Sequence, residues 1–202
     1  LTLLFALAIV FGAVVGILLA YETDLPQISS LEDFEPNIIT QVYNVDGSLL
    51  GEFSIERRVV VGFKDIPPVL RNAVVSVEDA EFWKHLGVNP WRVPGAALAN
   101  LRSGRREQGS STLTMQISRL LFLTPEKTYE RKIKEVILAF QIEKNFTKEE
   151  IFTLYCNQVY FGHGTYGVEA ASRFFFAKPA RELSVEEAAL LAAFEREVKD
   201  PL

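Results

Sequence analysis

The first 21 residues, from Leu1 to Tyr21, contain no charged side chain and are rich in Leu, Val, Ile, Ala and Phe. Since a helix rises about 1.5 Å per residue, such a run spans the roughly 30 Å hydrocarbon core of a bilayer. The alternatives are a buried core helix and a cleaved signal peptide, but the apolar region of a signal peptide is usually shorter. No small-residue cleavage pattern follows Tyr21. We therefore predict that residues 1–21 form a retained transmembrane helix.

Polar and acidic residues follow this run. Residues 22–38 contain Pro26 and Pro36, a composition typical of a juxtamembrane linker. The positive-inside rule does not act through acidic residues, so these charges do not orient the predicted span. Because Met115 is the only methionine, we expect the sequence to begin inside a longer protein.

The overall charge and cysteine content narrow the function classes a little. The net charge of -5 gives no support to nucleic-acid binding, although basic residues are dense between Arg102 and Lys134. The single cysteine, Cys156, excludes a disulfide within the chain. At 202 residues there is room for one medium-sized domain besides the N-terminal segment.

A small β element is predicted ahead of a helical body. The segments 39–43 and 48–53 flank the turn signal Asp46-Gly47, which predicts a hairpin, and residues 57–63 predict a third strand. From Pro67 onward the apolar residues recur at helical spacing. Helix starts and spans are predicted at Pro67-Pro68, at 94–101, at 113–121, from Thr124 to about Lys144, and after capping boxes at Thr147/Glu150 and Ser184/Glu187.

The segment from Glu78 to Gln116 carries the residue types needed for transfer chemistry on a phosphorylated substrate. Glu78 borders the apolar face of the predicted helix and is a candidate general base. A Gly/Ser/Thr loop at 109–112 offers hydroxyls and backbone donors to an anion. Positive charge to hold such an anion is supplied by Arg102, Arg105 and Arg106.

A second charged group occurs further along, at Arg131-Lys132-Ile133-Lys134-Glu135. Arg131 and Glu135 are spaced i,i+4, which by itself is typical of a salt-bridged surface helix. Beside Glu78 and the Ser/Thr loop, we favour a second carboxylate set among cations that grip a diphosphate. His85 and His163 are far apart in sequence and do not have the spacing of a zinc site.

These segments together resemble the peptidoglycan glycosyltransferase domain, glycosyltransferase family 51, of class A penicillin-binding proteins and monofunctional transglycosylases. The resemblance covers about residues 39 to 191 and depends on four motifs that occur in order. The first motif is Glu78, Asp79, Phe82, His85 and Gly87, and the second runs from Gly109 to Gln116. The third is Arg131, Lys132 and Glu135, and the fourth is Tyr155, Cys156 and Asn157, followed by Tyr160-Phe161-Gly162.

The resemblance implies a mainly α, lysozyme-like helical glycosyltransferase domain over residues 39–202, with a small N-terminal β element and one N-terminal transmembrane helix. The fifth family motif is missing, so the domain is expected to be incomplete at its C-terminus and the chain truncated at both ends. Family members polymerise lipid II into β-1,4 glycan strands, with inversion and release of undecaprenyl diphosphate. The implied setting is the bacterial plasma membrane, with a single-pass anchor and the catalytic domain on the extracytoplasmic face.

The resemblance also assigns roles to residues. Glu78 and Glu135 are expected to be catalytic, with Glu135 also a possible ligand for Mg²⁺ or Mn²⁺. The expected substrate-binding residues are Asp79, Phe82, Ser111, Thr112, Gln116, Arg119, Lys127, Arg131, Lys132 and Asn157. Expected partners are lipid II, the growing glycan, the membrane and other cell-wall synthesis proteins, with no nucleic acid.

Several positions depart from the family pattern, and two other functions stay open. Met115 stands where the family has Gln, Arg119 where Lys is usual and Lys127 where Arg is usual. A Leu-Pro turn expected after Ala193 is replaced by Phe194 and a charged run. The alternatives are a lysozyme-like glycan-cleaving enzyme and a non-catalytic membrane-anchored cell-wall scaffold with a degenerate site.

Overall fold

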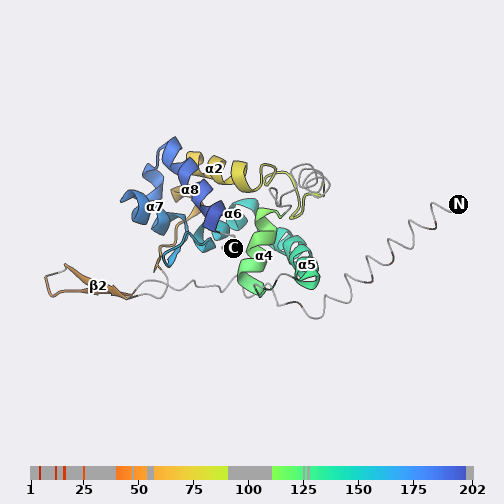
Figure 1. Cartoon of the computed structure of the whole chain (residues 1–202), viewed down its shortest axis with the longest axis horizontal. Coiled ribbons are helices and arrows are strands. Elements are labelled where there is room, and N and C mark those ends of the chain that lie inside the picture. The colour runs from red at the N-terminus through yellow and green to blue at the C-terminus, as the bar shows by residue number, and fades with distance from the viewer. Residues whose placement is uncertain are drawn as a thin grey trace.

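The computed structural model describes residues 5, 12, 16, 25, 40–46, 48–53, 57–90, 111–124, 126 and 128–198. Within these residues the chain is mainly helical, with six α-helices and two small two-stranded sheets (Figure 1), which confirms the predicted mainly α class. The helices are α2 (Pro68–Glu78), α4 (Leu113–Phe122), α5 (Tyr129–Asn145), α6 (Lys148–Gln158), α7 (Val168–Phe176) and α8 (Val185–Val198).

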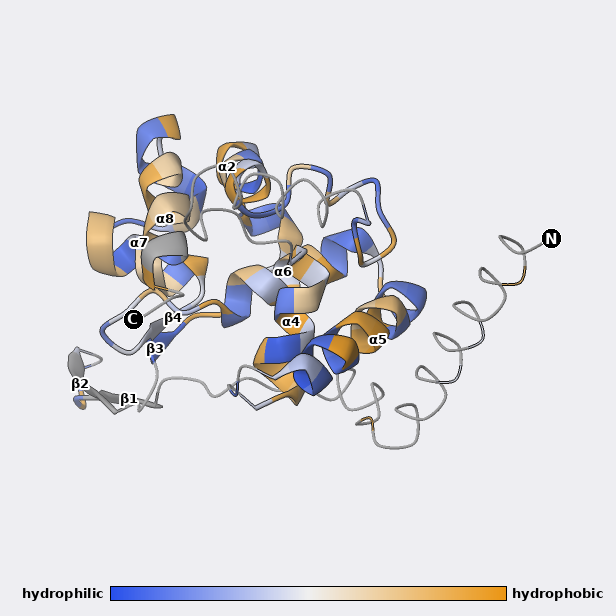
Figure 2. Ribbon diagram, turned by 45° about the vertical axis from the view of Figure 1, so that its right-hand side comes forward, coloured by the Kyte–Doolittle hydropathy of each residue, from blue (hydrophilic) through white to orange (hydrophobic). Residues whose placement is uncertain are grey.

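Helix α4 is the buried centre of this arrangement. Its residues from Leu113 to Ser118 are all buried, and the helix packs against both α5 and α6. Burial on every side is expected for a helix that neighbouring helices enclose. Figure 2 shows orange and blue residues on α5, and this helix packs against α4. On the other side of the core, α2 packs against α8.

The predicted helix boundaries are confirmed in most cases. Helix α2 begins at Pro68, and α4 begins after the cap residue Thr112, whose side chain accepts a hydrogen bond from the Met115 backbone. Both predicted capping boxes form. In each of them the side chain of the cap residue and that of the Glu three residues later bond reciprocally to backbone amides, for Thr147 with Glu150 and for Ser184 with Glu187.

The predicted start of α5 at Thr124 is wrong by about one turn. The helix begins at Tyr129, and its cap is Thr128, whose hydroxyl accepts a hydrogen bond from the Arg131 backbone amide. Arg131 Nε also donates to the Glu126 carbonyl, which holds the preceding segment against the first turn. Thr128 is therefore the residue that satisfies the free amides of this helix end.

The predicted hairpin is confirmed. Strand β1 (Thr40–Tyr43) pairs antiparallel with β2 (Leu49–Phe53), and the turn is held by Asp46, which accepts hydrogen bonds from the Ser48 amide and hydroxyl. Figure 1 shows this hairpin projecting from the helical body.

The predicted strand over 57–63 is wrong beyond its first two residues. Strand β3 covers Arg57–Arg58 and pairs in parallel with β4 (Thr165–Tyr166), and a short 3-10 helix, η2 (Phe63–Asp65), follows. The backbone N–H and C=O of Val61 bond to the side chain of Asn157 instead of to a neighbouring strand. These side-chain bonds satisfy the backbone there without a ladder.

Some predicted segments lie outside the described residues. These are the helix at 94–101, the linker at 22–38 apart from position 25, and the transmembrane helix at 1–21 apart from positions 5, 12 and 16. Among the residues that are described, no helix combines the length and the apolar character needed to cross a membrane.

Candidate active site

Glu78 is the last residue of α2, and its carboxylate is held by the central helix. Gln116 Nε2 on α4 donates a hydrogen bond to Glu78 Oε2 at 2.8 Å. Gln116 is only 5 % exposed, whereas Glu78 is partly exposed. An amide that points its nitrogen at a carboxylate must point its oxygen away, and Gln116 Oε1 has no hydrogen-bond partner within the described residues. The Glu78 carboxylate is thus positioned by a buried group while it keeps access to solvent.

Asp79 joins the end of α2 to the start of α4. It is 1 % exposed, and its Oδ2 atom accepts a hydrogen bond from the Leu113 backbone amide at 3.1 Å. The same oxygen lies 2.8 Å from His85 Nε2. A carboxylate at a helix N-terminus is stabilised by the helix dipole and by the free backbone amides. Asp79 therefore orients the segment that carries Glu78.

The segment between Asp79 and Asn89 is fixed against α4 and α5 by tight contacts. The Thr112 hydroxyl donates to the Gly87 carbonyl. Gly87 has a φ of 85°, and a Cβ at this position would lie 2.8 Å from the Ala139 carbonyl oxygen of α5. A glycine here permits both the left-handed backbone and the close approach to α5.

The second carboxylate, Glu135, lies on α5 between two cations. Lys132 Nζ is 2.9 Å from Glu135 Oε2, and Arg131 pairs with Oε1. Glu135 is 1 % exposed. The two cations that neutralise its charge lie on the same helix, one turn earlier. Lys132 Nζ also donates to the Ser111 hydroxyl at 2.7 Å. Ser111 thereby ties the loop before α4 to the charged face of α5.

The cations of this cluster are crowded. Partial burial, and then the charges of Arg119 and Arg131, lower the pKa of Lys132 to about 8, although the Glu135 carboxylate favours the charged ammonium. Burial and Arg119 likewise lower the pKa of Arg131. A dianion bound beside Lys132, Arg131 and Arg119 would relieve this repulsion, so the cluster favours a strongly anionic ligand.

Electrostatic coupling connects the two halves of the site. Burial raises the pKa of the Tyr155 phenol well above its usual value, and the charge of Glu78 acts in the same direction while that of Arg119 opposes it. Tyr155 on α6 therefore senses both the Glu78 carboxylate and the cation at the end of α4. Gln116 in the first turns of α4 holds Glu78, and Ser111 just before the cap of α4 holds Lys132, so residues around a single helix start position both groups.

Two residues that the sequence assigns to substrate binding instead make contacts within the protein. Phe82 is 0 % exposed and packs against Trp83 and Phe152, so it has no surface to offer a ligand in this structure. The Asn157 amide is engaged at both ends, donating to the Val61 carbonyl at 2.9 Å and accepting from its amide at 3.0 Å. These contacts make both residues part of the framework, and their expected contact with the substrate stays a prediction.

Most of the other site residues predicted from the sequence lie close together in the structure. The rest are outside the described residues. The structure brings Glu78, Asp79, Thr112 and Gln116 to one end of α4 and links Ser111, Arg131, Lys132 and Glu135 on its flank. Lys127 and the arginines at 102, 105 and 106 are outside the described residues.

The donor set does not fit the expected Mg²⁺ or Mn²⁺. Both oxygens of Glu135 already accept from cations, and a divalent ion prefers several oxygen ligands. In residues 57–90, 111–124 and 128–198, no three His, Cys, Asp or Glu side chains are grouped to hold a metal.

Sequence reasoning missed a supporting pair, Glu143 and Lys148. Glu143 Oε1 accepts from the Thr114 hydroxyl at 2.5 Å and from Lys148 Nζ at 2.7 Å, and Lys148 Nζ lies 4.4 Å from the centroid of the Phe82 ring. The pair connects α4, α5 and α6 and contacts Phe82, in the segment that follows Glu78. Its two members are five residues apart and lie on two different helices. This spacing matches no sequence pattern for a side-chain pair, so the pair could not be predicted before the fold was known.

Comparison with known proteins shows the family. The Transglycosylase family matches residues 46–200. Penicillin-binding protein 1A of Aquifex aeolicus is 46% identical over 187 residues, 93% of this chain and 26% of that protein. Penicillin-binding protein 1A of Escherichia coli is 41% identical over 181 residues, 90% of this chain and 21% of that protein.

A crystal structure of Penicillin-Binding Protein 1A from Haemophilus influenzae aligns with a TM-score of 0.38 and 21% identity, covering 81% of this chain and 15% of that one. The chain thus spans about a quarter of the length of the curated relatives. The family match covers most of the chain, including every motif from Glu78 to Asn157. The chain therefore belongs to the transglycosylase family, as a peptidoglycan glycosyltransferase domain.

Proposed function

We propose that this domain polymerises lipid II, a disaccharide-peptide on undecaprenyl diphosphate, into β-1,4-linked glycan. The observation that carries the proposal is the placement of two charged groups by the start of one helix. Gln116 holds Glu78 at 2.8 Å, and Ser111 accepts from Lys132 at 2.7 Å. A carboxylate and a cation cluster are what the nucleophile and the leaving group of this reaction need.

Glu78 is proposed as the general base. The 4-hydroxyl of the acceptor sugar is a poor nucleophile at neutral pH, so its proton must pass to a positioned base as its oxygen attacks the donor anomeric carbon. Glu78 is partly exposed and is held by Gln116, so its carboxylate is oriented while still accessible to a hydroxyl. The new C–O bond forms on the face opposite the leaving group, with inversion at the anomeric carbon.

The cation cluster is proposed to stabilise the leaving diphosphate. As the anomeric C–O bond breaks, its electron pair passes to undecaprenyl diphosphate, whose charge Lys132, Arg131 and Arg119 offset. Glu135 pairs with Arg131 and Lys132, and its negative charge reduces the repulsion between these cations. Hydrolysis of a neutral glycan would leave this cluster without a partner, which favours transfer over the lysozyme-like alternative.

The membrane setting belongs to the same proposal. A lipid-linked substrate stays in the bilayer, so we propose that the apolar segment at 1–21 anchors the domain as a single span in the bacterial plasma membrane. The catalytic domain, with a lysozyme-like fold, then lies on the extracytoplasmic face, where lipid II, the growing glycan and other cell-wall proteins are its partners.

The direct test is polymerisation of labelled lipid II in detergent by the full chain and by Glu78→Gln. The control is Glu182→Gln, which changes a Glu whose side chain is 55% exposed in the 3-10 helix η3 (Ala180–Glu182). Loss of a general base is expected to lower the rate by about 100-fold or more, while the control keeps the parental rate.

The outcomes separate the three functions. Polymer from Glu78→Gln at the parental rate would contradict the assignment of the base. Cleavage of a preformed glycan by the parent would favour the hydrolase, and lipid II binding without any polymer would favour the non-catalytic scaffold.

A further inference from the structure

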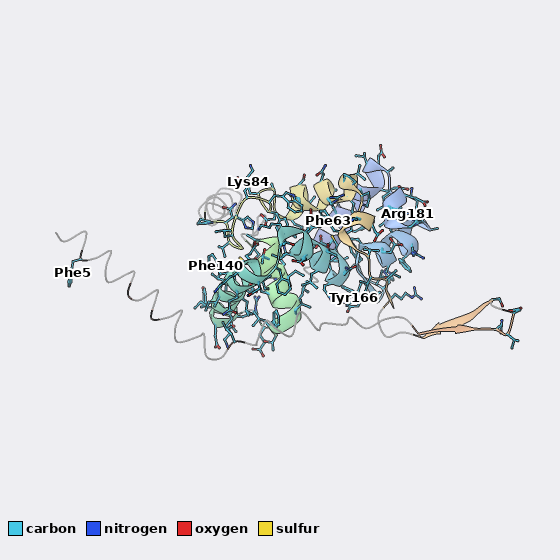
Figure 3. The ribbon with its side chains drawn as sticks, turned by 180° about the vertical axis from the view of Figure 1, so that it is seen from behind. Phe5, Phe63, Lys84, Phe140, Tyr166 and Arg181 are labelled. Carbon is cyan, nitrogen blue, oxygen red and sulfur yellow. The ribbon has the colours of Figure 1, made fainter. Side chains whose placement is uncertain are left out.

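An open pocket of about 590 Å³ lies beside the start of α2. None of its lining residues belongs to the site around Glu78 and Lys132. Figure 3 labels Phe63, which forms part of the pocket wall next to α2. The lining consists of Gly62, Phe63, Lys64, Asp65, Arg71 and Glu149. Its size is in the range of sites that bind small ligands, and its wall combines one aromatic ring with charges of both signs.

Arg71 is held in a fixed orientation at this pocket. Its Nε atom donates to the Ile66 carbonyl at 2.9 Å, and its guanidinium carbon lies 4.3 Å from the centroid of the Phe63 ring. Across residues 57–90, 111–124 and 128–198, its two terminal nitrogens have no hydrogen-bond acceptor. A guanidinium that is oriented by stacking and by one hydrogen bond presents a ready fork to a carboxylate.

The remaining charges of the pocket are of both signs. Lys64 and Glu149 are exposed, and within the described part of the chain neither side chain forms an ion pair. Asp65, by contrast, accepts a hydrogen bond from the Gly62 amide at 3.1 Å. The pocket therefore has two cations suited to a carboxylate, Arg71 and Lys64, and one uncommitted carboxylate suited to an amine, Glu149.

The pocket is close to the candidate active site along the same helix. Arg71 and Glu78 are seven residues apart on α2, which puts them on the same side of the helix and about 10 Å apart along its axis. Phe63 makes an edge contact with Trp83, at 6.3 Å between ring centroids, and Trp83 lies in the segment after Glu78 and is 43% exposed. A ligand of modest length can reach from one site to the other.

We propose that this pocket binds a peptide that carries both a free carboxylate and a free amine. The carboxylate pairs with Arg71 and Lys64, the ammonium pairs with Glu149, and the Phe63 ring packs on the apolar part between them. Such a peptide has two sources, a free peptide or the peptide attached to the glycan substrate. The second source rests on the proposed polymerase function, while the first does not.

The binding test uses the full chain in detergent with alanyl-alanine, its N-acetyl form and its C-terminal amide, followed by ligand-observed NMR. We expect saturable binding of alanyl-alanine that Arg71→Met and the C-terminal amide each weaken by about tenfold or more. Glu149→Gln should weaken alanyl-alanine but leave the N-acetyl form unchanged. Arg181→Met, at an exposed position outside the pocket, is the control and should bind as the parent does.

Two probes that each keep one free carboxylate and one free amine distinguish the two sources: alanyl-lysine joined to a disaccharide through the peptide N-terminus, and N-acetyl-alanyl-lysine. Tighter binding of the disaccharide-linked probe supports the glycan-linked source, and equal binding supports a free peptide. The proposal is overturned if neither probe binds, or if binding is the same in Arg71→Met, Glu149→Gln and the parent. Because binding is measured without turnover, a failure to polymerise lipid II leaves this result unaffected.

Discussion

Gln116 Nε2 donates to Glu78 Oε2 at 2.8 Å, which places a buried amide directly behind the carboxylate that is proposed as the base. Gln116→Met keeps the volume of the side chain and removes this donor. A hydrogen bond to a charged group contributes about 1.5–3 kcal/mol, so we expect the rate of glycan polymerisation to fall by about 10- to 100-fold. Steady-state polymerisation of labelled lipid II measures the effect.

Gln141→Met is the matched control, because Gln141 lies on α5 and its side chain is partly exposed. Its rate should equal that of the parent. Equal rates in Gln116→Met and the parent would show that Glu78 needs no orienting donor.

Lys132 predicts the pH dependence of anion binding. Burial and the neighbouring arginines lower its pKa from the ordinary value of 10.5 to about 8. Above pH 8 the folded protein loses this charge, so the affinity for inorganic pyrophosphate should fall from about pH 7.5 to pH 9. Lys132→Arg keeps a charge at every pH used and should bind with little change over this interval, even though its geometry differs. Titration calorimetry at a series of pH values measures both.

The same shift affects stability with a definite sign. Between pH 8 and pH 10.5 the unfolded chain keeps the Lys132 proton that the folded chain has lost, so the contribution of this residue to the free energy of unfolding rises with pH. Urea unfolding of the parent and of Lys132→Met is measured at pH 7.5 and 9.5. The free energy of unfolding of the parent, relative to that of the variant, should be higher at pH 9.5 than at pH 7.5. A difference that stays the same at the two pH values would mean that Lys132 keeps its proton in the folded chain.

Glu135 is expected to stabilise the fold as well as the site. It is buried between Arg131 and Lys132, and Glu135→Gln leaves two partly buried cations without their counter-charge. The expected loss is about 3 kcal/mol in the free energy of unfolding, from urea titration. Glu130→Gln is the control on the same helix, because Glu130 forms an exposed pair with Lys134 that is worth less than about 1 kcal/mol. Similar losses in both variants would place Glu135 outside any buried ion pair.

The local parts of this fold are predictable from sequence, because each depends on residues a few positions apart. The capping box at Thr147/Glu150 and the turn at Asp46 are complete within four residues, and both form as predicted. The start of α5 shows where local information ends. Thr124 and Thr128 are both suitable caps, and the contact of Arg131 with the Glu126 carbonyl accompanies the choice of the second.

The motifs of the candidate site can be recognised in the sequence, but the contacts that their side chains make within the fold cannot. Phe82 and Asn157 belong to recognisable motifs, yet Phe82 is fully buried and Asn157 bonds to the backbone of Val61, 96 residues earlier in the chain. The pairing of Gln116 with Glu78 spans 38 residues in the same way. Such contacts depend on how the helices pack, and no spacing along the chain encodes them.

Gly87 offers a test of the close approach between the motif segment and α5. Gly87 and Gly162 both have a φ of 85°, so alanine at either position must adopt a left-handed backbone, at a cost of about 1–2 kcal/mol. A Cβ at Gly87 would also lie 2.8 Å from the Ala139 carbonyl oxygen, whereas at Gly162 the nearest atoms are those of Val198 at 4.0 Å. Gly87→Ala should therefore lower the free energy of unfolding by at least about 1 kcal/mol more than Gly162→Ala. It should also reduce polymerisation, because the displaced segment directly follows Glu78 and Asp79 at the end of α2. Urea unfolding and lipid II turnover measured on the two variants check both expectations, and equal losses of stability would mean that the segment does not pack against α5.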